Sequence, residues 1–206
     1  MTTQILKSST ILILVAAFGL SAPLNAQGDK DRRYDIKSAI IKYKIQGMVE
    51  GEETWYIDDY GANEARYSNA VIKMFGEQES EELTIIKGRD EYKIDLKKRT
   101  GTKEPVEFFV KIENSDKPID KTLPPFEQFA QAEGMKKVGT GEVLGKKADI
   151  WEVEGKTKIY LWNGIPLKID AYMGEQILLK MEALEIQDGA DIPATKLEIP
   201  ADITFE

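Results

Sequence analysis

Few side chains in this 206-residue sequence could carry out covalent or metal chemistry, because it contains no cysteine and no histidine. Thiol nucleophiles, disulfides, Ser-His-Asp triads and the usual zinc sites are therefore excluded. An acylated N-terminal cysteine is excluded as well, so we do not expect a lipoprotein. Catalysis would have to use carboxylates, lysine, tyrosine or serine, and we expect no cofactor and no metal.

One glycine-rich segment, Gly139-Thr-Gly-Glu-Val-Leu-Gly-Lys-Lys147, has the composition of a phosphate-binding loop. A P-loop needs four residues between its glycines and a serine or threonine after the lysine. Here three residues separate Gly141 from Gly145, and a second lysine follows Lys146. The spacing therefore predicts a hairpin turn and not a nucleotide site.

Two adjacent acid pairs, Asp58-Asp59 and Glu81-Glu82, are candidates for acid–base catalysis. Neighbouring residues of a strand point to opposite faces, so neither pair converges on one substrate atom. A carboxylate-dependent hydrolase would need two inward-facing acids from different strands, about 5–10 Å apart across a cleft. We rank this function third and expect a protein that is not an enzyme.

The elements that would position any site read as β-strands with period-two alternation. Ile41, Tyr43 and Ile45 alternate with lysine and glutamine, which is typical of a strand buried on one face. Strands are expected at 41–45, 53–57, 65–75, 83–86, 92–96, 148–153, 157–162, 165–173 and 176–186. Asn163-Gly164 predicts a tight hairpin. A two-turn helix is expected before Gly134, and the proline-flanked tail 192–200 is expected to be extended.

The first residues have the organisation of a secretory signal peptide. Lys7 precedes the apolar run Ile11–Leu20 and small residues up to Ala26. The run is too short for a transmembrane helix, which needs about 20 apolar residues. We predict cleavage after Ala26, periplasmic localisation, a flexible segment at 27–37 and one domain at 38–206. The net charge of −8 argues against a nucleic-acid partner.

Three segments carry a resemblance to a known family. They are Gly141–Lys147, the stretch Trp162-Asn-Gly-Ile-Pro-Leu-Lys168, and Ile192–Pro200. They resemble the C-terminal half of exported bacterial proteins related to the outer-membrane lipoprotein carriers of the LolA/LolB type. Thr54–Gly61 is similar to the early hairpin of periplasmic relatives of those carriers. The resemblance implies a half-open antiparallel β-barrel whose concave apolar face, covered by helices, accepts acyl chains.

The fold class expected is thus mainly β, with a curved antiparallel sheet forming an incomplete barrel and one or two short helices. Several strands have apolar residues on both faces, as an apolar concave face would require. We predict a ligand cavity lined by Tyr43, Trp55, Ile57, Ile94, Trp162, Leu167, Ile169 and Leu179. The favoured function is the binding of a lipid or lipoprotein acyl chain. The alternative is an envelope protein–protein interaction module whose hollow is filled by its own side chains.

Overall fold

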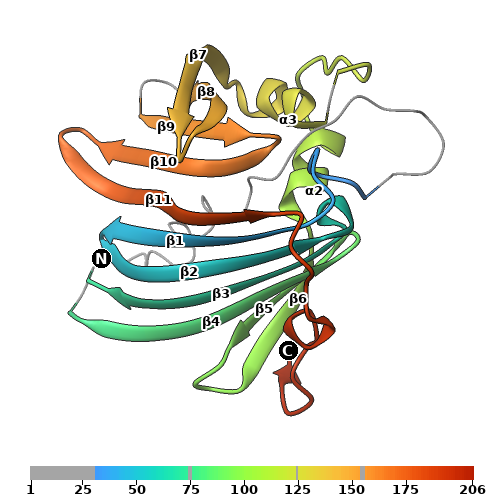
Figure 1. Ribbon diagram of the computed structural model, residues 1–206, viewed down its shortest axis with the longest axis vertical. Helices are drawn as coiled ribbons and strands as arrows, with labels where there is room; N and C mark the ends of the chain where they lie inside the picture. Colours follow the sequence, from blue (N-terminus) through green and yellow to red (C-terminus); the bar gives the residue numbers. More distant parts are fainter. Residues whose placement is uncertain (1–30, 74–75, 124, 154–155) are drawn as a thin grey trace, which may run out of the picture.

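A computed structural model describes residues 31–206 except 74–75, 124 and 154–155, and Figure 1 shows its arrangement. The predicted signal peptide, residues 1–26, lies outside the described residues. Twelve strands among the described residues form one sheet in the order β12-β6-β5-β4-β3-β2-β1-β11-β10-β9-β8-β7. The strands are β1 (Ala39–Gly47), β2 (Val49–Asp58), β3 (Asn63–Ile72), β4 (Gln78–Lys87), β5 (Asp90–Asp95), β6 (Thr100–Pro105), β7 (Lys136–Val143), β8 (Lys146–Val153), β9 (Thr157–Trp162), β10 (Ile165–Met173), β11 (Gln176–Asp188) and β12 (Thr204–Phe205).

The sheet is curved and does not close into a barrel. All neighbouring strands pair antiparallel except the short β12, which lies parallel to β6 at one edge. β1 pairs with β11, so the first strand and the long strand near the end of the sequence lie side by side in the middle of the sheet. β7 and β12 are the two edges of the sheet. The expected incomplete β-barrel is confirmed.

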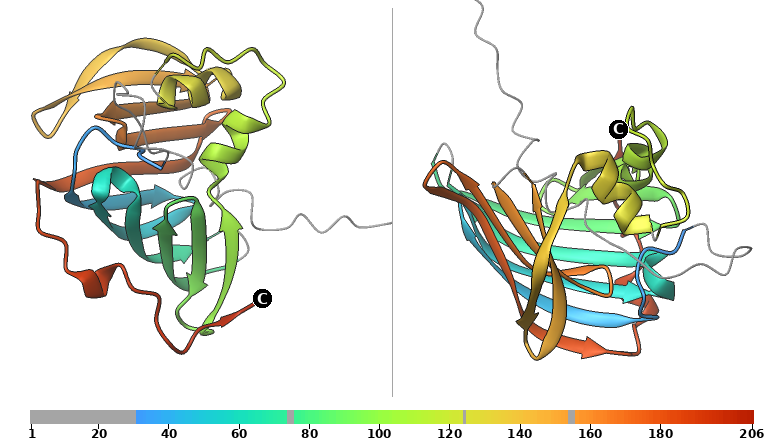
Figure 2. Two further views of the ribbon diagram at one scale, coloured as in Figure 1. Left: turned by 90° about the vertical axis from the view of Figure 1, so that its right-hand side faces the viewer. Right: turned by 90° about the horizontal axis from the view of Figure 1, so that it is seen from above.

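Two short helices, α2 (Glu107–Glu113) and α3 (Pro125–Glu133), connect β6 to β7. Figure 2 shows them at one end of the trough formed by the sheet. Phe126 of α3 packs edge-to-face on Trp151 of β8, with ring centroids 4.8 Å apart. We call the face that these helices cover the inner face. The sequence predicted α3, whereas α2 and the strands β6 and β7 were not anticipated.

The hairpin expected at Asn163-Gly164 joins β9 to β10. Both residues have positive φ, at 49° and 84°, as a type I′ turn requires. The segment Gly139–Lys147 also folds as predicted, since β7 and β8 pair through a turn at Leu144-Gly145. No helix begins there, so a phosphate-binding geometry is absent from this described segment.

The largest core cluster lies on the inner face, between the helices and strands β1, β2 and β8–β11. A second cluster lies on the opposite, outer face of β3–β5. It contains Ala65, Leu83, Ile85 and Ile94. The tail after β11, including the 3-10 helix η3 (Ala194–Lys196), covers this cluster through Leu197, Ile199 and Ile203. The tail therefore lies against one face of the sheet, but the 3-10 helix Ala194–Lys196 interrupts the extended conformation expected for 192–200.

Part of the segment expected to be flexible, 27–37, is anchored in the fold. Arg33 and Tyr34 are almost completely buried. The Tyr34 ring packs directly on Gly61, in the 3-10 helix η2 (Asp59–Gly61), where an added Cβ would lie 2.5 Å from the ring. Gly61 also has a φ of 85°, so a side chain there would be strained as well as crowded.

Candidate functional site

A cavity of about 620 Å³ opens on the inner face in the half of the sheet formed by β2–β6. Its volume lies within the range of about 300–1,000 Å³ that small-molecule sites occupy. One end is apolar and the opposite wall is polar. The apolar end is formed by Ile45, Val49, Ala70, Ile72 and Leu179. Basic residues in the lining are Arg66, Lys93 and Lys98, and acidic ones are Glu53, Glu82, Asp95, Glu104 and Glu206.

The strand register explains how polar and apolar groups share this cavity. Residues directly opposite each other on neighbouring strands point to the same face. One cross-strand row on the inner face runs from Tyr43 to Glu53, Ser68, Glu82 and Asp95, from β1 through β5. Side chains that are distant in sequence are thereby placed in one line across the cavity.

The basic side chains of the cavity wall are ion-paired. Lys93 Nζ lies 2.9 Å from a carboxylate oxygen of Glu104, and Lys98 Nζ lies 2.7 Å from one of Asp95. These pairs are partly or fully exposed, so each contributes little to stability. Each lysine is nevertheless already paired with a carboxylate, so neither is free of a counter-charge to attract an anionic ligand.

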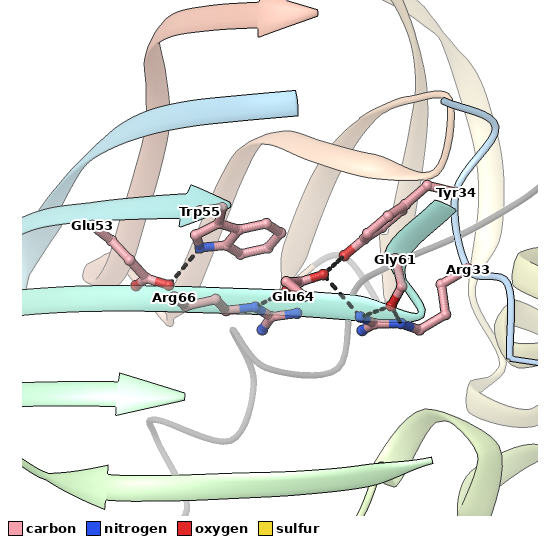
Figure 3. Close-up of polar contacts among 7 residues, drawn as sticks. All are labelled: Arg33, Tyr34, Glu53, Trp55, Gly61, Glu64 and Arg66. Carbon is pink, nitrogen blue, oxygen red and sulfur yellow. Dashed lines mark hydrogen bonds and ion pairs between the residues drawn. The ribbon is translucent and has the colours of Figure 1, made fainter. Parts of the chain in front are cut away.

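Behind the cavity wall is a buried network of charged groups, drawn in Figure 3. Glu64 accepts hydrogen bonds from Arg33 Nη2 at 2.9 Å, from the Tyr34 hydroxyl at 2.6 Å, and from Arg66 Nε. Burial alone would raise the pKa of Glu64, but the two guanidinium groups and the tyrosine outweigh burial and lower it. Glu64 is therefore ionised in the folded protein, and its single negative charge is shared between the guanidinium groups of Arg33 and Arg66.

Glu53 lies where this network meets the cavity. Its Oε1 accepts a hydrogen bond from Trp55 Nε1 at 2.5 Å, as Figure 3 shows. The Arg66 guanidinium stacks 4.0 Å above the Trp55 ring centroid. Burial raises the pKa of Glu53, and the charge of Arg66 and the bond from Trp55 oppose this in part. The residue is 8% exposed, so its carboxyl group is held at the wall in a poorly solvated position.

The structure places the eight residues predicted to line a cavity in several environments. Tyr43, Trp55, Ile57, Leu167 and Ile169 are fully buried in the inner core cluster. Trp162 belongs to the same cluster, with Lys146 Nζ 4.4 Å above its ring centroid. Leu179 and Ile94 border the cavity, although Ile94 packs in the outer cluster. Their role in ligand binding stays a prediction.

Two polar residues of the wall, Glu53 and Arg66, were not singled out from the sequence. The sequence did indicate that Glu53 shares a face with Trp55, because the two residues are two positions apart in a strand. It gave less indication that Arg66 lies beside Trp55, since that contact depends on the register between β2 and β3. Register cannot be read from either strand alone.

The hydrolase hypothesis required two inward-facing acids across a cleft, and Glu53 and Glu82 both line the cavity. Two strand spacings separate them, about 10 Å between backbones. Glu53 borders the cavity and is held in place by the hydrogen bond that its Oε1 accepts from Trp55. The described residues contain no group of three or more acids placed to hold a metal ion. The hydrolase stays the third-ranked hypothesis.

Comparison with known proteins shows a likeness of fold. No family model and no curated protein matches the sequence. An uncharacterized conserved protein from Thermus thermophilus has a similar structure, with a TM-score of 0.52 at 10% identity over 82% of this chain and 90% of that one. This similarity supports a mainly β, unclosed curved sheet.

Two structures of MucB have lower similarity. MucB alone gives a TM-score of 0.43 at 15% identity, over 84% of this chain and 60% of MucB. The Pseudomonas aeruginosa MucA/MucB complex gives 0.43 at 14% identity, over 81% of this chain and 57% of the other. The chain thus spans about 60% of the MucB chain that it matches.

Proposed function

We propose that this protein is an exported, non-enzymatic binding protein that holds an amphipathic ligand, a lipid or a lipoprotein acyl chain, in the open cavity. The observation that carries the proposal is the cavity itself. It continues the apolar inner face beyond the region that the helices fill. Neither helix among the described residues is long and apolar enough to span a membrane.

The apolar end gives the ligand's hydrocarbon part a surface to contact. Ile45, Val49 and Leu179 are each at least nine-tenths buried but still border the cavity. Each methylene removed from water contributes about 0.8 kcal/mol, so a partly enclosed chain would gain several kcal/mol before association costs. The polar wall would then contact the ligand's head group. The resemblance to the lipoprotein carriers, which implies acyl-chain binding, supports the same assignment.

Native mass spectrometry of protein purified gently from the cell envelope tests this proposal. We expect a discrete adduct of a few hundred daltons that is lost on delipidation and regained on addition of a matching lipid. A clean apo mass without uptake of added lipid would contradict the proposal and favour a protein–protein interaction module. Chemical conversion of the added lipid would favour the hydrolase.

A pair of variants on neighbouring residues connects the adduct to the cavity. Ser68 lines the cavity, whereas Asn69 lies on the opposite face of β3. Ser68→Trp should fill the cavity and abolish the adduct. Asn69→Trp adds the same ring to the same strand and should leave the adduct unchanged. Loss of the adduct in both variants would show a general effect on folding, and its retention in Ser68→Trp would place the ligand elsewhere.

A further inference from the structure

Two carboxylates of the cavity wall differ from the other charged groups there. Glu53 and Glu82 both line the cavity, and among the described residues neither forms an ion pair. Glu82 accepts a hydrogen bond from the Ser80 hydroxyl at 2.8 Å. Glu53 accepts its bond from the Trp55 indole. Both donors are neutral, so the two negative charges are not compensated by a neighbouring cation at hydrogen-bond distance.

The nearby basic groups have other partners. Arg66 is bonded through Nε to Glu64, Lys93 to Glu104, and Lys98 to Asp95. The charge of Arg66 acts on Glu53 more strongly than the opposing charge of Glu82 does, and the charge of Lys98 also acts on Glu82. The cavity lining nevertheless has five acidic and three basic side chains, and Glu53 and Glu82 belong to one row of it.

Geometry brings these carboxylates together with a hydroxyl group. Glu53 on β2 is opposite Ser68 on β3, and Ser68 is opposite Glu82 on β4. All three side chains line the cavity. A primary ammonium group has three N–H donors and no acceptor, and this row offers it one hydroxyl and two carboxylate acceptors. An anionic head group would instead meet two like charges.

The burial of this row supplies an independent reason to expect a ligand. Glu53 is 8% exposed, and a carboxylate so placed is costly unless it is paired with a cation. Glu53 accepts one hydrogen bond, from the neutral indole of Trp55, and it borders the cavity. A buried carboxylate at a cavity wall without a bonded cation indicates that a cationic ligand can complete it.

We propose that the cavity selects ligands that carry a primary ammonium group next to an apolar chain. The ammonium lies between Glu53, Ser68 and Glu82. The hydrocarbon extends toward the neighbouring row of Ile45 and Ala70 and on to Leu179. This inference rests on the proposed function, because it assigns the head-group chemistry of the same ligand.

Binding of decylamine and decanoate, measured by calorimetry below their critical micelle concentrations at neutral pH, tests the inference. The two probes have the same chain and opposite charges. We expect the protein to bind decylamine at least tenfold more tightly than decanoate. If neither probe binds, the proposed function fails together with the inference. If decanoate binds equally well or better, the inference alone is overturned.

Matched variants distinguish a local contact from an effect of net charge. Glu82→Gln removes one carboxylate of the row, and Glu81→Gln removes the same charge from the opposite face of β4. Glu82→Gln should reduce the preference for decylamine to less than threefold, and Glu81→Gln should retain it. Equal losses in both variants would overturn the inference, since only long-range charge would then matter. Ser68→Ala, which keeps both charges, should weaken decylamine binding without affecting decanoate.

Discussion

The two halves of the curved sheet place their apolar residues on opposite faces. In the half formed by β8–β11 and β1, apolar side chains fill the inner face under α2 and α3. In the half formed by β3–β5, the apolar cluster lies on the outer face and the C-terminal tail covers it. Each apolar cluster lies where another segment covers it. The inner face of the second half is left open as a cavity with a polar wall and an apolar end.

The inner face changes from apolar to polar side chains along a single cross-strand row. Ile41 on β1 is opposite Trp55 on β2, which is opposite Arg66 on β3, then Thr84 on β4 and Lys93 on β5. β2 lies at the boundary and is apolar on both faces, with Trp55 inside and Tyr56 outside. A continuous sheet can thus support a packed core in one half and a ligand cavity in the other.

The largest expected effect is in the helix-covered half. Phe129→Ala removes a ring that packs 5.2 Å from Phe108 and 6.4 Å from Phe126, between centroids. We expect it to lower the free energy of unfolding by about 4 kcal/mol, because a large cavity replaces the ring. Thr84→Ala in the open half should change it by less than about 0.5 kcal/mol. Urea denaturation measures both, and similar losses would contradict the contrast between the halves.

The second prediction concerns the charged network at the boundary between the halves. Glu64→Gln leaves Arg33 and Arg66 buried without their counter-charge, and should cost about 3 kcal/mol. The lowered pKa of Glu64 means that its stabilisation is present above its unfolded pKa, about 4.3, and is lost as the pH falls through the folded pKa. The difference between wild type and variant should therefore shrink in acid.

An exposed ion pair provides the control for that experiment. Glu113 lies 2.7 Å from Arg89 Nη1 at the surface. Glu113→Gln should change the free energy of unfolding by less than about 1 kcal/mol at neutral pH. An equal loss of unfolding free energy in Glu113→Gln and Glu64→Gln would mean that the buried network stabilises the fold no more than an exposed ion pair does.

The smallest expected effect is a pH slope from Glu53. Its raised pKa means that the folded protein holds a proton that the unfolded chain releases, between about pH 4.3 and the raised value. The free energy of unfolding should therefore decrease as the pH rises through this window. Glu53→Gln should reduce the slope, and Glu52→Gln, on the opposite face of β2, should keep it. An unchanged slope in Glu53→Gln would show that its carboxyl is well solvated.

The sequence by itself determined most strands of the sheet. Alternation and turn residues act over a few positions, so β9 and β10 were placed with their observed bounds and the turn at Asn163-Gly164 was predicted. The apolar character of both faces of β2 was visible for the same reason. α2 was missed because its helical character in seven residues depends on packing of Phe108 and Phe109 against the core.

Only the tertiary structure decided which face of each strand is the inner one. Strand alternation alone places Glu53 and Trp55 on the same face of β2. The pairing of β2 with β3 and of β3 with β4 is what brings Glu53, Ser68 and Glu82 into one row. The same pairing puts Ile94 on the outer face, under the tail. Strand register and covering segments are long-range properties, since they depend on contacts between residues far apart in the chain.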